Sequence, residues 1–182
     1  MNYKHIVETI NAHQLRNVLT FDHINDRTIL TNDLATKQQG LYWFWTSYSN
    51  QELKDVVRPL NMTGEIDISI LVEQRMGLDS ICKLNSDQFR VVYNGIGGGA
   101  STSSFGLRER ILQEIKGQES TGSISITNSS LNDFSKWRVT YVNFNDEEFL
   151  NDAGERIDYL QHAELFEMLW RLHYGWPILC RR

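Results

Sequence analysis

The chain has 182 residues, enough for one domain with its own hydrophobic core and no stabilising disulfides or metals. Apolar residues make up 41% of it and the net charge is −5, which excludes a disordered chain and a polycation. No apolar run is long enough to cross a membrane, and the first residues lack the apolar core of a secretory signal. We therefore expect a cytoplasmic protein that keeps Cys82 and Cys180 reduced.

Hydrophobic periodicity predicts the regular elements of the amino-terminal half. Ile66, Ile68, Ile70 and Val72 alternate with mostly polar residues, a pattern typical of a half-buried strand. The predicted elements are a helix over 2–19, a polar stretch over 21–39, an aromatic strand over 41–45, a loop or short helix over 48–63, and the strand over 66–72.

The carboxyl-terminal half alternates strands and helices in the same way. The predicted elements are a strand over 89–93, a flexible glycine- and serine-rich loop over 97–104, a helix over 107–115, a strand over 137–144 and a helix over 155–174 that stops at Gly175. This order predicts an α+β fold, with a small mixed or antiparallel sheet flanked by helices.

Three common kinds of site have little support. Residues 95–100 fit G-x-G-x-x-A, but no helix opens at the third small residue and no acidic ribose contact follows at the required distance. The five histidines lack metal-ligand spacing, and nothing near either cysteine indicates a cysteine nucleophile.

Glu167 is the carboxylate that stands out. It falls in a stripe at helical spacing whose other members are Leu160, Ala163, Trp170 and Tyr174. A carboxylate among apolar and aromatic neighbours costs free energy unless it is paired or binds a cation. A structural ion pair with an arginine is the plain alternative, whereas Glu164 is expected on a solvated face with Met168 and Arg171.

A series of short motifs runs through the chain in a fixed order. Gly40-Leu41-Tyr42 precedes Tyr93-Asn94-Gly95, and Arg110, Glu167 and Pro177-Ile-Leu-Cys180 follow. This order resembles the GIY-YIG nuclease family over roughly residues 40–182. The resemblance implies a GIY-YIG-like core, with 1–39 as an N-terminal helical extension and 48–87 as an insertion between the first two motif strands.

The sequence departs from the family pattern at several places. Asn94 replaces an isoleucine, and Cys180 stands where an asparagine is common. Glu114 takes the place of a frequent histidine one turn after the arginine. The two motif tyrosines are 51 residues apart, where the family usually has a short hairpin.

The resemblance implies a metal-dependent DNA endonuclease of restriction or phage type. Tyr42, Tyr93, Arg110 and Glu167 would be catalytic, with Glu167 also the ligand of Mg²⁺ or Mn²⁺. Tyr42 would position or deprotonate the attacking water with support from Tyr93, and Arg110 would stabilise charge on the phosphate. Duplex DNA is the implied partner, and a homodimer is compatible with this assignment.

Two other hypotheses stay open. The same scaffold can serve as a catalytically degenerate module that binds nucleic acid or protein, which the net charge, Glu114 and Cys180 favour. The motifs can also be coincidental in an unrelated α+β protein. The nuclease hypothesis requires Tyr42 and Tyr93 on neighbouring strands, with Arg110 and Glu167 facing them across one concave site.

Overall fold

The structure is a computed structural model. It describes residues 3–24, 27–30, 34–58, 66–98, 105–117, 122–145, 158–159 and 161–181. Its elements in chain order are α1 (Tyr3–Arg16), β1 (Val18–Leu19), β2 (Phe21–Ile24), β3 (Arg27–Leu30), β4 (Gly40–Thr46), α2 (Asn50–Lys54), α3 (Ile68–Arg75), β5 (Asn85–Ser86), β6 (Phe89–Gly97), α4 (Leu107–Lys116), the 3₁₀ turns η1 (Ile126–Asn128) and η2 (Phe134–Lys136), β7 (Trp137–Asn143) and α5 (Ala163–Tyr174).

The main sheet is antiparallel, with the strand order β1-β7-β4-β6-β5. The α+β class expected from the sequence is therefore confirmed. Strand β4 is central: Tyr42 lies opposite Gly95 of β6 on one side and Tyr141 of β7 on the other. Strand β5 pairs only with residues 89–90, so the rest of β6 forms the edge of this sheet.

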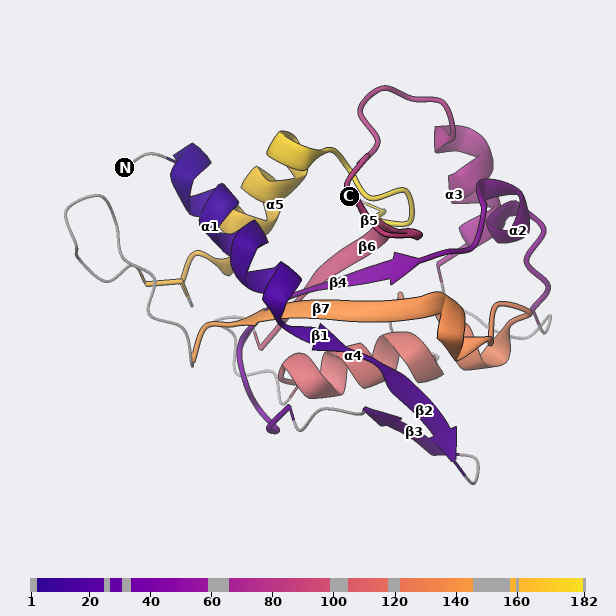
Figure 1. The fold of residues 1–182 in the computed structure, drawn as a ribbon, viewed down its shortest axis with the longest axis horizontal. Helices are drawn as coiled ribbons and strands as arrows, with labels where there is room; N and C mark the ends of the chain where they lie inside the picture. Colours follow the sequence, from indigo (N-terminus) through magenta and orange to yellow (C-terminus); the bar gives the residue numbers. More distant parts are fainter. Residues whose placement is uncertain are drawn as a thin grey trace.

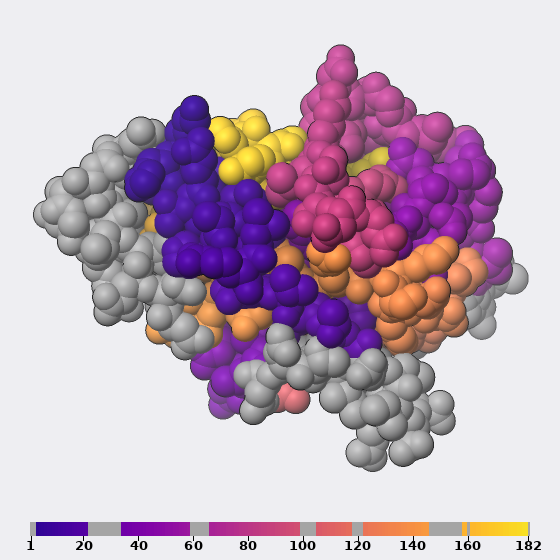
Figure 2. Space-filling model, in the orientation of Figure 1, coloured from indigo at the N-terminus to yellow at the C-terminus, as the bar shows by residue number. Residues whose placement is uncertain are grey.

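The segment before Gly40 does more than the sequence indicated. Residues 18–19 form β1 and extend the main sheet next to β7. The stretch 21–39, expected to be polar and irregular, contains the β2–β3 hairpin, which forms a second sheet of its own. Helix α1 packs beside α5, as the space-filling view also shows (Figure 2).

Each face of the main sheet is covered by helix (Figure 1). Alternation along β4 divides its side chains between two apolar clusters, because successive strand residues point to opposite faces. Tyr42 and Phe44 pack with α4 in one cluster, and Leu41, Trp43 and Trp45 pack with α1 and α5 in the other. Every residue of β4 is buried as a result.

The strand predicted over 66–72 is wrong, because residues 68–75 form helix α3. The spacing of Ile68 and Val72 fits one helical face as well as one strand face, and both are buried while Ile70 is 49% exposed. The side chain of Asp67 caps the helix by accepting a hydrogen bond from the Ile70 amide at 3.0 Å. The segment 48–87, expected as an insertion, therefore carries the helices α2 and α3 where the strand 66–72 was predicted.

The last helix is shorter than predicted. It begins at Ala163 rather than near residue 155, because the described residues just before it form turns stabilised by local hydrogen bonds such as that from Gln161 N–H to Asp158. It ends at Tyr174 before Gly175, as expected. Most of the loop predicted over 97–104 and the start predicted for this helix lie outside the described residues. No helix in the described part of the chain is long and apolar enough to cross a bilayer.

Gly40 gives a test of the packing between β4 and β7. A Cβ on this residue would lie 1.8 Å from the backbone oxygen of Val142 and 2.9 Å from a methyl carbon of Leu107. We expect Gly40→Ala to lower the free energy of unfolding by at least about 3 kcal/mol, because a backbone atom cannot move aside as a side chain can. Urea unfolding measures this, and a loss under about 1 kcal/mol would contradict the strand pairing.

Candidate functional site

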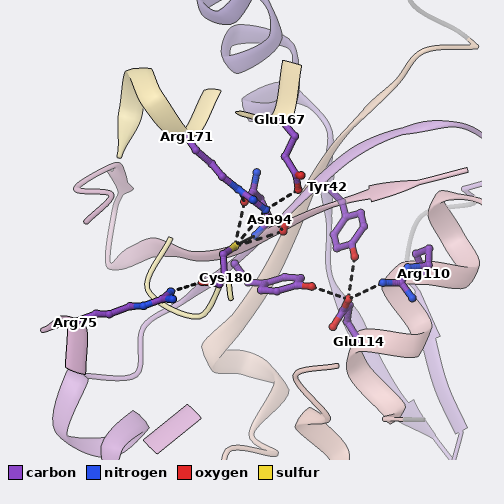
Figure 3. A network of polar contacts seen from close by, with 9 residues as sticks. Tyr42, Arg75, Asn94, Arg110, Glu114, Glu167, Arg171 and Cys180 are labelled. Atoms are coloured by element: carbon purple, nitrogen blue, oxygen red, sulfur yellow. Dashed lines mark hydrogen bonds and ion pairs between the residues drawn. The ribbon is translucent and has the colours of Figure 1, made fainter. Parts of the chain in front are cut away.

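A pocket of about 480 Å³ lies along the free edge of β6, beyond the short β5 pairing. The structure brings all four residues singled out in the sequence to this one pocket: Tyr42, Tyr93, Arg110 and Glu167 line it. Figure 3 shows Tyr42, Arg110 and Glu167 converging on this region. The remaining lining residues are Asn94, Gly95, Ile96, Arg171, Cys180 and Arg181.

The four residues do not share one face of the sheet. Tyr42, Tyr93 and Arg110 belong to the side covered by α4, whereas Glu167 comes from α5 on the opposite side. They meet because the pocket lies at an edge, where groups from both layers extend past β6. Glu167 therefore approaches over the edge. The expected geometry, with Glu167 facing the tyrosines across the sheet, is wrong in this respect and counts against the nuclease hypothesis, although Glu167 lines the same pocket.

The two tyrosines lie on neighbouring strands and donate hydrogen bonds to one carboxylate. Tyr42 Oη and Tyr93 Oη lie 2.9 Å and 3.1 Å from Oε1 of Glu114. Gly95 allows this geometry, since a Cβ there would lie 2.4 Å from Tyr42 Oη. Tyr42 is fully buried, whereas Tyr93 is partly exposed, and both line the pocket.

Glu114 is enclosed by donors from four parts of the chain. Besides the phenols, Arg110 lies 3.5 Å from Oε1, and the Ile124 amide donates to Oε2 at 3.0 Å. The residue is 1% exposed. Burial raises the pKa of Glu114, and Arg110, the phenols and the Ile124 amide oppose that rise. Burial, followed by the Glu114 charge, raises the pKa of both Tyr42 and Tyr93 well above that of a free phenol.

Glu167 is paired with an arginine. Its Oε1 accepts a hydrogen bond from Nη2 of Arg171, one turn later on α5, at 2.7 Å. Both side chains are largely buried, at 14% and 12% exposed. Burial raises the pKa of Glu167 to about 7, against the lowering effect of Arg171. Such a pair is the plain alternative to a metal ligand expected from the sequence, but Arg171 was expected on a solvated face.

Asn94 and Cys180 hold Arg171 in place from the other side. Asn94 Oδ1 accepts hydrogen bonds from Arg171 Nε at 2.9 Å and from Cys180 Sγ at 3.2 Å. The Arg171 guanidinium also lies 5.0 Å from the ring centre of Trp176. Burial raises the pKa of the Cys180 thiol to about 12, so this residue acts as a neutral hydrogen-bonding group.

The carboxyl-terminal segment reaches the pocket because other parts of the chain anchor it. Leu179 N–H donates to Val92 of β6 at 2.9 Å, and Trp176 pairs with Ile81 in a parallel bridge. The Arg75 side chain donates to the backbone oxygens of Ile178 and Cys180. These contacts place Cys180 and Arg181 at the edge of β6.

For a divalent cation the pocket offers one carboxylate, that of Glu167. No three His, Cys, Asp or Glu side chains gather into a metal-binding group anywhere in the described residues. Mg²⁺ is commonly held by one or two carboxylates, with waters and substrate phosphates completing the shell. Glu167 fits such a cation only together with a phosphate, and only after its pairing with Arg171 changes.

Sequence reasoning missed the three residues that organise this site. Glu114 and Asn94 were noted only as departures from a motif, and Arg171 as a helix charge. Glu114 did carry a usable signal, since it follows Leu107 by seven residues and Ile111 by three and so falls on the buried face of α4.

No protein-family model, curated protein or solved structure matches this chain. Its function is therefore inferred from the residues of the pocket and their geometry.

The first prediction for the site concerns Glu114. We expect Glu114→Ala to lower the free energy of unfolding by about 3–5 kcal/mol, because it removes the carboxylate beside Arg110 and the acceptor of two phenols and of the Ile124 amide. Chemical denaturation measures the loss, with Glu164→Ala, at an exposed position of α5, as control. A loss as small as that of the control would show that the Glu114 cluster contributes little to folding.

The second prediction concerns pH. Because the folded-state pKa of Glu167 is raised to about 7, ionisation of this group destabilises the fold as pH rises from its unfolded pKa of 4.5. Replacing the Glu167 carboxylate by a neutral amide removes this change in the free energy of unfolding, which amounts to no more than about 3 kcal/mol. As pH rises from 4.5 to about 7, we expect the free energy of unfolding of Glu167→Gln to increase relative to that of the wild type, as chemical denaturation at each pH measures. An unchanged difference would place the pKa of Glu167 near its ordinary value.

Proposed function

We propose that this protein is a metal-dependent endonuclease that hydrolyses phosphodiester bonds in duplex DNA. The observation that carries the proposal is the convergence of two phenols, Arg110 and Glu167 on one pocket from four separate elements. The pocket lining is also suited to an anion, since it contains three arginines and one carboxylate. The GIY-YIG resemblance of the motif order supports the same assignment.

Arg110 is proposed to bind the reacting phosphate. Its Nη2 lies 3.5 Å from Glu114, and its side chain is 25% exposed at the pocket. Its Nη1 donates to the Gln113 side chain, so two neighbours on α4 hold the guanidinium where it lines the pocket. A preorganised cation of this kind stabilises the charge that develops on the phosphate oxygens in the transition state.

Tyr93 and Glu114 provide a route for the proton of the attacking water. A phenol whose pKa is raised is a poor base alone, but Tyr93 already donates to Glu114. As the water oxygen forms its bond to phosphorus, its proton passes to Tyr93 Oη and the phenol proton passes to Glu114. The bond from phosphorus to the leaving sugar oxygen breaks, and that oxygen takes a proton from solvent. Tyr42 donates a hydrogen bond to Oε1 of Glu114 from the buried side and fixes the position of that carboxylate.

Glu167 is proposed to hold Mg²⁺ or Mn²⁺ together with a phosphate oxygen. When bound, such a cation supplies Lewis-acid stabilisation of the phosphate and of the leaving oxygen. The second candidate function is binding of nucleic acid without cleavage. The ion pair between Glu167 and Arg171 favours this alternative, because it occupies the carboxylate on which metal chemistry depends.

Cleavage assays on plasmid and mixed-sequence duplex DNA separate the two functions. We expect nicking that requires Mg²⁺ or Mn²⁺ and stops with a chelator. Glu167→Ala should keep DNA binding and lose cleavage, with Glu164→Ala as the matched control on the same helix. Arg110→Ala should be slower by about 10²–10³-fold, with Arg108→Ala as its control. Tyr93→Phe should remove more activity than Tyr42→Phe, because Tyr93 is the partly exposed phenol of the two.

Thermal unfolding of each variant separates loss of chemistry from loss of fold. A wild type that binds duplex DNA and never cuts it, across metals and sequences, would favour the binding module. Cleavage that persists in full with excess chelator would contradict the role given to Glu167.

A further inference from the structure

Arg171 is the most strongly held charged group of the pocket that the proposed chemistry does not use. Besides Glu167, its guanidinium contacts Asn94 twice, through the side-chain oxygen at 2.9 Å and the backbone oxygen at 3.3 Å. It also contacts the Trp176 ring and Cys180 Sγ, the latter at 3.6 Å. A surface ion pair would not need such a frame, which fixes the guanidinium at the wall of the pocket.

Beside Arg171 lies a hydrogen-bond donor that lacks an acceptor. Nδ2 of Asn94 is buried, and no acceptor for it is found among the described residues. The orientation of this amide is fixed, because its oxygen already accepts from Arg171 and Cys180, and a flip would set N–H groups against the guanidinium. A buried donor without a partner costs free energy, so the site favours a ligand that brings an acceptor.

We propose that Arg171 is a second phosphate-binding arginine of this pocket, and that its ion pair with Glu167 opens when a phosphate binds, which frees the carboxylate for a divalent cation. The inference rests on the proposed function and goes beyond it, since it names what couples DNA binding to metal binding. The ligand class is a phosphodiester of the DNA backbone. Its oxygens can accept from the guanidinium and from Asn94 Nδ2.

The charges of the pocket explain why the two events are coupled. With Arg171 on Glu167, a divalent cation would have to displace a guanidinium at 2.7 Å and leave it unpaired in a largely buried place. A phosphate gives the guanidinium a new anionic partner, and its oxygens complete the shell of the cation. Metal then binds weakly before DNA and well after it.

The test measures Mn²⁺ binding without DNA, by the loss of the free-ion signal in electron paramagnetic resonance. The proteins are the wild type, Arg171→Gln, Arg181→Gln and Glu167→Gln, at about pH 8.5 so that Glu167 is ionised in the wild type. An adjacent cation weakens proton binding by a carboxylate by one to three pKa units, so we expect Arg171→Gln to bind Mn²⁺ about tenfold more tightly.

The other two variants are the controls. Arg181→Gln removes the same charge from the same pocket and should change the affinity by less than about twofold. Glu167→Gln should abolish binding. Equal gains in Arg171→Gln and Arg181→Gln would reduce the effect to net charge and overturn the proposal, as would an unchanged affinity in Arg171→Gln. Arg171→Met, which removes the same charge but keeps an unbranched stem of similar length, replaces Arg171→Gln with the same expected outcome if that variant does not fold.

The phosphate contact is tested separately, with a short duplex in chelator over a series of salt concentrations. Loss of one phosphate contact should weaken binding and lower the salt slope by about 1 in Arg171→Gln. An unchanged slope would overturn the phosphate role. A wild type that binds no duplex would overturn both the proposed function and the phosphate-binding role of Arg171. The Mn²⁺ measurement still decides whether Arg171 competes for Glu167.

Discussion

A strand with neighbours on both sides and helices over both faces leaves no room for solvent, and β4 is such a strand. Its alternating side chains are committed to two apolar clusters, so a polar site open to solvent cannot form above or below the middle of the sheet. It can form where pairing stops. Strand β6 loses its outer neighbour after the short contact with β5, and the pocket lies along that stretch, within reach of both helical layers.

The same constraint explains why Glu114 is so fully bonded. A carboxylate beneath the sheet, on the α4 side, is cut off from water and has to be neutralised by donors inside the protein. The two phenols, Arg110 and the Ile124 amide provide them, and they come from β4, β6, α4 and the segment before η1. The cluster that completes the fold at this place therefore also fixes the positions of the phenols and of the arginine at the pocket.

Much of this arrangement could be predicted from the sequence, and the errors of that prediction have physical causes. The central strand, α4 and the end of α5 follow directly from apolar periodicity and from glycine punctuation. The region 66–72 was misassigned because apolar residues at every second position also repeat at every fourth, so strand and helix patterns coincide over a short run. The β2–β3 hairpin was missed because each strand has only four residues and neither alternates apolar with polar residues. Which side chain pairs with which, such as Arg171 with Glu167, depends on the path of the chain in space. Hydrophobic periodicity does not specify that path.

The departures from the motif series also look different once they are placed in space. In the sequence, Asn94 and Cys180 are two unrelated substitutions, and each weakens the resemblance. In the structure they contact each other, since Sγ of Cys180 donates to the Asn94 side chain and accepts from the Asn94 amide at 3.3 Å. The side-chain amide of Asn94 on β6 and the thiol of Cys180 on the carboxyl-terminal segment therefore form one hydrogen-bonded pair. Two departures that meet in one contact do not count as independent evidence against a working site, because a change at either position alters the surroundings of the other.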